Sequence, residues 1–117
     1  MDPTDTFEPS ALDLLGRMGP PGFTSKMIDL FLSSTSILVD MVEKSSRSGD
    51  WGGVAFAAHS LKSSAGNLGL SHLTRQADEI DRQVREGNTE AAARLAGELR
   101  SVWDAACAAL RVYRSRT

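Results

Sequence analysis

The sequence predicts an all-α protein, an antiparallel up-and-down four-helix bundle with a short additional helix at its N-terminus. Apolar residues recur at helical spacing in four long stretches, and no stretch sustains the alternation that is typical of a strand. The linkers between the stretches are short, which favours antiparallel packing of consecutive helices. A length of 117 residues suits one domain. We therefore expect residues 10–114 to form a single bundle domain and residues 1–9 to be a flexible N-terminus.

Each long helix is predicted from a stripe of apolar or small residues separated by three or four positions. Such a stripe covers one side of a helix and predicts the face that packs in the core. The stripes are Met27, Leu30, Phe31, Ser34, Ile37, Leu38 and Met41; Trp51, Val54, Ala58, Leu61, Ala65 and Leu68; Leu70, Leu73, Ala77, Ile80 and Val84; and Ala92, Leu95, Leu99, Val102, Ala106, Ala109 and Tyr113.

The breaks between the stripes carry residues that begin or end helices. The segment Gly19–Gly22 contains Pro20 and Pro21, which must separate the short first helix from the second because proline lacks a backbone donor. Side chains that accept hydrogen bonds from a first helical turn precede or open each stripe. The expected N-caps are Ser10, Thr24, Asp50, Ser71, and either Asn88 or Thr89.

Composition excludes several classes of function. The formal net charge of −2 argues against binding of nucleic acid, which relies on a strongly basic surface. No apolar run approaches the roughly 20 residues of a membrane span, and the N-terminus lacks the apolar segment of a signal peptide. Cys107, the single cysteine, cannot form an internal disulfide and suits a reducing compartment. These features predict a cytoplasmic domain without membrane insertion.

His59 is the candidate reactive residue. At about 100° per residue it lies roughly 130° from the centre of the third stripe, so it should face solvent. Positions one and two turns away hold small residues, among them Ala55, Ser63 and Gly66, which would leave the imidazole accessible to a large partner. A neutral imidazole is a nucleophile, and Lys62 on the adjacent turn could pair with a phosphoryl group on the ring. An ordinary surface histidine is the alternative at this point.

The segment 58–69 reads AHSLKSSAGNLG and closely resembles the signature of histidine-containing phosphotransfer (HPt) domains. In that family a His-x-Leu-Lys run is followed by small residues and then by a Leu-Gly pair. The resemblance extends over most of residues 10–112, through the Gly-Phe start of the second helix, the Gly-Asp-Trp before the third and the long final helix. Ser63 departs from the pattern because many members have glycine there, although serine is also small.

The resemblance implies a phosphorelay intermediate. His59 would accept a phosphoryl group from the aspartate of a receiver domain and pass it to another receiver aspartate, with Lys62 as the charge partner of the phosphate. Ser63 and Gly66 would supply clearance, and Gly69 would end the helix. The protein would be a monomeric carrier without kinase activity or a cofactor of its own. Its partners would be receiver domains of response regulators and hybrid histidine kinases, and Mg²⁺ is expected in the receiver.

The docking surface and the class of function have alternatives. Ala55 and Phe56 lie on the side of His59, where Phe56 would either pack at the core edge or touch the partner. Leu12, Leu15 and Met27 would form an apolar rim for the partner, or the first helix would instead pack over the end of the bundle. A helical adaptor that docks a signalling protein without phosphorylation is the competing function. A dimeric kinase bundle is disfavoured because Glu does not follow His59.

Overall fold

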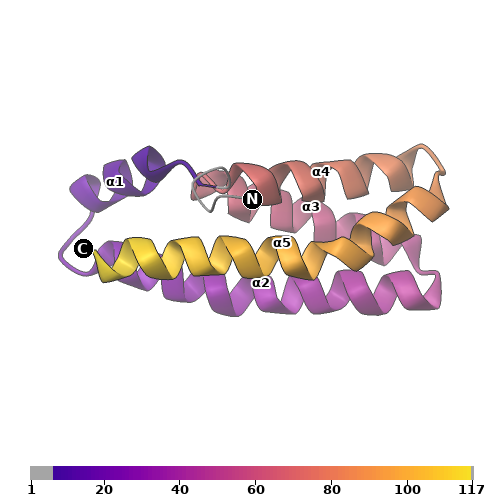
Figure 1. Ribbon diagram of the computed structural model, residues 1–117, viewed down its shortest axis with the longest axis horizontal. Coiled ribbons are helices and arrows are strands. Elements are labelled where there is room, and N and C mark those ends of the chain that lie inside the picture. Colours follow the sequence, from indigo (N-terminus) through magenta and orange to yellow (C-terminus); the bar gives the residue numbers. More distant parts are fainter. Residues whose placement is uncertain (1–6, 117) are drawn as a thin grey trace.

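The computed structural model describes residues 7–116, which form five helices and no strand (Figure 1). Each of the four long helices packs against two neighbours, in the cyclic order α2, α3, α4, α5. The prediction of an all-α bundle with a short N-terminal helix is confirmed. The helices are α1 (Pro9–Met18), α2 (Phe23–Ser48), α3 (Trp51–Asn67), α4 (Ser71–Arg85) and α5 (Thr89–Ser115).

The helix α1 lies at the end of the bundle where α2 begins and α5 ends (Figure 1). The Phe7 ring meets the Tyr113 ring edge-on, with centroids 5.6 Å apart, and the Tyr113 hydroxyl donates a hydrogen bond of 2.6 Å to Asp13. The Glu8 N–H donates to the Gly69 carbonyl at 2.7 Å. The segment from Phe7 to Pro9 thus makes defined contacts, in contrast to the flexible N-terminus predicted for residues 1–9. Residues 1–6 of that prediction lie outside the described residues.

The core is made by the predicted stripes of α3, α4 and α5, but the predicted stripe of α2 is rotated from the observed one. Leu30 and Ile37 are 64% and 66% exposed. Apolar residues occur nearly all round α2, so spacing alone is also consistent with a stripe next to the buried one. The packing of α2 against both α3 and α5 determines which stripe is buried. Its members are Ile28, Phe31, Thr35, Val39 and Val42.

Among the helix starts, the predicted cap Asp50 is confirmed, because its carboxylate accepts a 3.0 Å hydrogen bond from the Gly53 N–H. The caps predicted at Ser10, Thr24 and Ser71 are wrong by one or two positions. Asn88 occupies the N-cap of α5, but its side chain donates to Gln83. A helix can also begin without a side-chain cap, and the N-cap residues of α1, α2 and α4 make no such hydrogen bond. The N-caps observed for α1, α2 and α4 are Glu8, Gly22 and Leu70.

Gly69 terminates α3. Its φ of +75° is left-handed, a conformation that glycine adopts without a steric penalty. The Leu70 N–H donates to the Ala65 carbonyl at 3.0 Å and the Gly69 N–H to the Gly66 carbonyl at 3.2 Å, the paired bonds of a Schellman ending. The turn therefore redirects the chain into α4, which then returns alongside α3.

None of the helices within residues 7–116 is both long enough and apolar enough to cross a membrane.

Candidate functional site

His59 projects from the middle of α3 on the side away from the core. Its side chain is 69% exposed, whereas Ala58 and Leu61 beside it are completely buried. Ser63, one turn further on, and Gly66, two turns on, are exposed and small. The imidazole therefore stands above its surroundings along this half of the helix, where a large partner can reach it.

Exposed apolar side chains lie on the helices that form this side of the bundle. Phe56, one turn before His59 on α3, is 63% exposed, and Ala55 beside it is half-buried. On α2, Leu30 and Ile37 are separated by two turns and share one face. We call the surface carrying Leu30, Ile37, Phe56 and His59 the α2–α3 face.

A shallow hollow of about 170 Å³ lies between α2 and α3, toward the end of α3. Met27 and Leu30 line it from α2, and Ser64 and Asn67 line it from α3. This contact places the apolar residues of α2 next to the segment that follows His59. The predicted contact residue Met27 is thus half-buried beside the α2–α3 face.

The first helix contributes less to this surface than predicted. Leu12 is completely buried in the core, so it has no surface to offer a docked protein, and its assignment as a contact residue is corrected. Leu15 is half-buried and packs against the same core. The burial of Leu12 and the packing of Leu15 agree with the second predicted alternative, in which the first helix packs over the end of the bundle. Sequence spacing did not distinguish them because an apolar residue on a short helix suits either role.

Lys62 pairs with an acidic residue of α4 that sequence reasoning missed. Its Nζ lies 2.9 Å from Asp78 Oδ1, with both side chains partly exposed. The hydrogen bond and the positive charge of Lys62 lower the pKa of Asp78 below its ordinary value. Lys62 is therefore turned toward α4 in the unphosphorylated protein, one turn from the imidazole.

A second acidic residue of α4 faces the imidazole itself. Asp81 is only 7% exposed, and its Oδ2 lies 3.8 Å from His59 Nδ1. The same oxygen lies 3.4 Å from the Arg85 guanidinium, one turn along α4. The sequence carries a signal for Asp81, because it directly follows Ile80 and stands one turn after Ala77, both in the apolar stripe of α4. An acidic residue at the edge of a buried stripe needs a partner.

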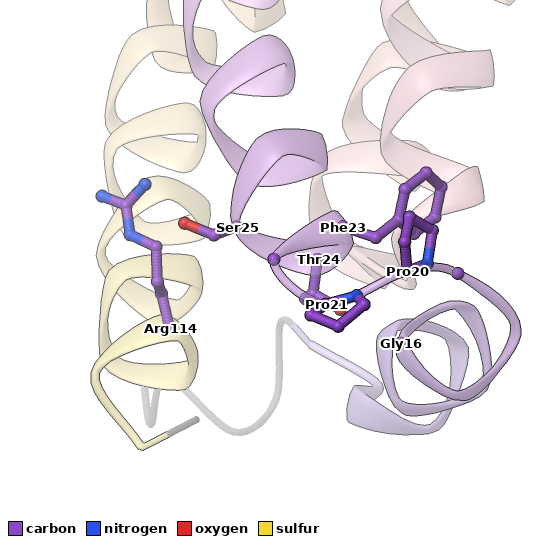
Figure 2. Close-up of a pocket in the computed structure, with 9 residues that line it drawn as sticks. Gly16, Pro20, Pro21, Phe23, Thr24, Ser25 and Arg114 are labelled. Atoms are coloured by element: carbon purple, nitrogen blue, oxygen red, sulfur yellow. The ribbon is translucent and has the colours of Figure 1, made fainter.

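A second hollow, of about 510 Å³, lies elsewhere, at the turn between α1 and α2 (Figure 2). Pro20 and Pro21 shape its wall, and Thr24, Ser25 and Arg114 bring polar groups to it. Arg114 forms an ion pair with Asp29. The hollow belongs to the end of the bundle and not to the middle of α3, where His59 lies.

The remaining candidate groups do not build a second reactive site. Burial raises the pKa of the Cys107 thiol to about 11, so this sulfur stays protonated at neutral pH and is a poor nucleophile. His72 is half-buried at the start of α4. Within residues 7–116, no three histidine, cysteine or acidic side chains are grouped as a metal site would require.

The structure thus defines a small helical bundle with an exposed histidine in the middle of its third helix. The family model described as Hpt domain matches residues 26–111, and the chain belongs to this family. Its role is therefore histidine phosphotransfer in a phosphorelay.

A solved structure supports the fold over nearly the whole length. The chain is similar to histidine-containing phosphotransfer protein B (HptB) from Pseudomonas aeruginosa PAO1, with a TM-score of 0.87, 18% sequence identity and 96% of each chain covered. The search of curated proteins returned no match.

Proposed function

We propose that His59 accepts a phosphoryl group from a receiver-domain aspartate and passes it to the aspartate of another receiver. The observation that carries this proposal is the exposed imidazole at the middle of α3, bordered by small residues on the following two turns. A receiver aspartate lies within a folded domain, so the acceptor must reach it while the two proteins are docked. An imidazole that stands above Ser63 and Gly66 meets that requirement.

The docking contact in this proposal is the α2–α3 face. Leu30, Ile37 and Phe56 are large apolar side chains of α2 and α3 that are each more than half exposed, and exposed apolar surface is typical of interaction sites. The hollow lined by Met27 and Leu30 would take an apolar side chain of the partner. The partner would then cover α2 and α3 together, with His59 inside the contact.

Lys62 acts in this proposal as the charge partner of the phosphoryl group. A phosphohistidine at position 59 would bring negative charge one turn from an ammonium group that pairs with Asp78 in the free protein. Because Lys62 and Asp78 are both partly exposed, exchange of one anionic partner for another requires little rearrangement. Phosphorylation would thus draw Lys62 from α4 toward the ring.

The chain supplies the nucleophile and the docking face, and the receiver supplies Mg²⁺ and the reacting carboxylate. Phosphoryl transfer depends on positioning and on stabilisation of charge, and these contributions can be divided between two docked proteins. The carrier would act as a monomer, without a cofactor or kinase activity of its own.

The proposal is tested by incubating the chain with a phosphorylated receiver and following the label. We expect acid-labile phosphate on the wild-type chain and none on His59→Gln. The matched control is His72→Gln, which removes the other histidine and should leave labelling unchanged.

Two further outcomes are decisive. Label that persists in His59→Gln would refute the assignment of His59. Receiver binding by the wild-type chain with no label at all would support the adaptor function instead. Incubation with ATP and Mg²⁺ alone should give no label, since the carrier is proposed to lack kinase activity.

A further inference from the structure

We propose that Asp81 is a positioning residue for His59, and this proposal rests on the proposed function. The Asp81 carboxylate, held by Arg85, keeps the Nδ1 hydrogen of the imidazole turned toward α4 and leaves the Nε2 lone pair facing the incoming receiver. Both contacts are made by a single oxygen, Oδ2, at 3.8 Å from His59 Nδ1 and 3.4 Å from Arg85.

Asp81 is the fixed member of its pair with His59. Its side chain is 10% exposed, against 69% for that of His59. An ionised carboxylate with so little access to water needs positively charged or hydrogen-bonding partners. The exposed imidazole can turn about its side-chain bonds, whereas the carboxylate has little access to water and also contacts Arg85. The orientation of the pair is therefore imposed by α4 on His59.

The other acidic residues on this part of α4 have partners of their own. Asp78 pairs with Lys62, and Glu79 accepts hydrogen bonds from Arg82 and Gln83. Asp81 is the acidic residue whose contacts include the imidazole. The three acids lie within one turn of α4, so they provide matched variants that differ in which group they contact.

The chemistry of the contact sets the tautomer. A carboxylate accepts hydrogen bonds and cannot donate them, and a neutral imidazole carries hydrogen on one of its two nitrogens. A lone pair on Nδ1 would face the negative charge of Asp81, whereas a hydrogen there faces an acceptor. The partner of one ring nitrogen thus determines the state of the other. The distance of 3.8 Å is longer than a hydrogen bond, and the proposal requires the exposed ring to turn toward the carboxylate to form one.

Transfer then proceeds without loss of the Nδ1 hydrogen. The Nε2 lone pair forms a bond to phosphorus while the bond from phosphorus to the receiver carboxylate breaks, and the electron pair stays on that carboxylate. The ring, still protonated at Nδ1, becomes a phosphoimidazolium whose positive charge faces Asp81. Onward transfer reverses these changes: the second aspartate bonds to phosphorus, and the electrons of the N–P bond return to Nε2.

The first test is the tautomer of His59 in the intact chain, measured from the ¹⁵N shifts of the imidazole nitrogens at a pH where the ring is neutral. We expect hydrogen on Nδ1 in the wild type and a loss of that preference in Asp81→Asn. Glu79→Gln, which changes a neighbouring acid, should keep the wild-type pattern. A wild-type ring with its hydrogen on Nε2 would overturn the proposal without reference to any variant.

The second test is the rate of transfer from a phosphorylated receiver to the same variants. Asp81→Asn keeps the shape of the side chain, and we expect transfer to slow by about tenfold, equivalent to about 1.4 kcal/mol in the barrier. Glu79→Gln should transfer at the wild-type rate. Equal rates for Asp81→Asn and the wild type would refute a role for Asp81 in transfer.

The two proposals fail in different ways. If wild-type His59 takes no phosphoryl group from any receiver, the proposed function is wrong, whatever the tautomer. If the wild type is labelled on His59 while Asp81→Asn matches it in rate and in ¹⁵N pattern, the carrier function stands and the role of Asp81 is rejected.

Discussion

Two of the regions in which charged residues join neighbouring helices of this bundle are built differently. Between α2 and α5, Arg100 donates to both carboxylate oxygens of Glu43, at 2.9 and 2.8 Å, and to Asp40 at 2.6 Å. Trp103 lies beside it, with the guanidinium 5.8 Å from the ring centroid, and its indole N–H donates to Thr35 at 2.9 Å. We call this region the α2–α5 seam.

Between α3 and α4 the contacts are fewer and looser. Lys62 meets Asp78 at 2.9 Å, and His59 lies 3.8 Å from Asp81. We call these residues, together with Arg85, the α3–α4 edge. At the seam, each donor has an acceptor at hydrogen-bond distance. At the edge, the imidazole keeps one side open. We therefore expect the seam to contribute to stability and the edge, in the proposed function, to leave His59 accessible to a partner.

The difference between the two regions is tested most strongly by a substitution that obstructs the open side of the imidazole. Ser63→Arg places a long side chain one turn from His59 on the exposed side of α3, and we expect a loss of transfer of about 100-fold or more because the receiver is sterically excluded. The measurement is the rate of labelling by a phosphorylated receiver. Ser101→Arg, on the exposed side of α5, is the control and should transfer normally. Normal transfer in Ser63→Arg would place the docking surface elsewhere.

Removing Lys62, the cation one turn from His59, should have the next largest effect on transfer. Lys62→Ala leaves the phosphoryl group on His59 without its proposed charge partner, and we expect transfer to slow by about tenfold or the phosphohistidine to be shorter-lived. Thermal unfolding should barely move, because partly exposed ion pairs contribute little to stability. Lys44→Ala removes an exposed lysine of α2 as a control. Unchanged kinetics in Lys62→Ala would remove this residue from the mechanism.

At the seam the opposite pattern is expected, with stability lost and transfer retained. Thr35→Val keeps nearly the same shape but removes the acceptor of the Trp103 N–H inside the bundle. We expect the free energy of unfolding, measured with denaturant, to fall by about 1–2 kcal/mol. Ser33→Ala removes an exposed hydroxyl two residues away on α2 and should change the free energy of unfolding little. A folded Thr35→Val protein that transfers slowly would contradict the separation of the two regions.

The smallest effect concerns Arg100 and depends on pH. Its hydrogen bonds lower the pKa of Glu43 below the ordinary value of 4.5, so the stabilisation is fully present above that pH and is lost as pH falls through the lowered value. We expect Arg100→Ala to reduce the free energy of unfolding by about 1 kcal/mol at neutral pH and by less in acid. The difference between wild type and variant is measured across pH. A difference that grows toward acid would refute this account.

Much of the fold was predictable because its determinants are local. Apolar spacing in α3, α4 and α5 indicated both the helices and the faces that are buried. Asp50 was identified as a cap because a carboxylate before a helix accepts from its first turn. The α2 face was misassigned through Leu30 and Ile37, since that helix is apolar on more than one side. Leu30 and Ile37 are apolar side chains that packing leaves exposed on α2.

The residues of the candidate site were likewise predictable from the sequence only in part. His59 and Lys62 were proposed from sequence as a pair because they lie one turn apart on one helix. The contacts of Asp78 with Lys62 and of Asp81 with His59 were not predicted, although Asp81 stands at the edge of an apolar stripe. Their partners lie on another helix, and no spacing within α4 shows which of its residues meets α3.

The sequence by itself determined the helices, the exposure of His59, its small neighbours and the position of Lys62 one turn away, because all of these depend on a repeat of 3.6 residues within one segment. The tertiary structure alone decided that Leu12 is buried, that Leu30 and Ile37 are exposed, and that Asp81 faces the imidazole. These outcomes depend on how far each helix is rotated and shifted against its neighbours. Packing of the whole bundle sets that rotation and shift, and a difference of one residue moves a side chain by about 100° around its helix.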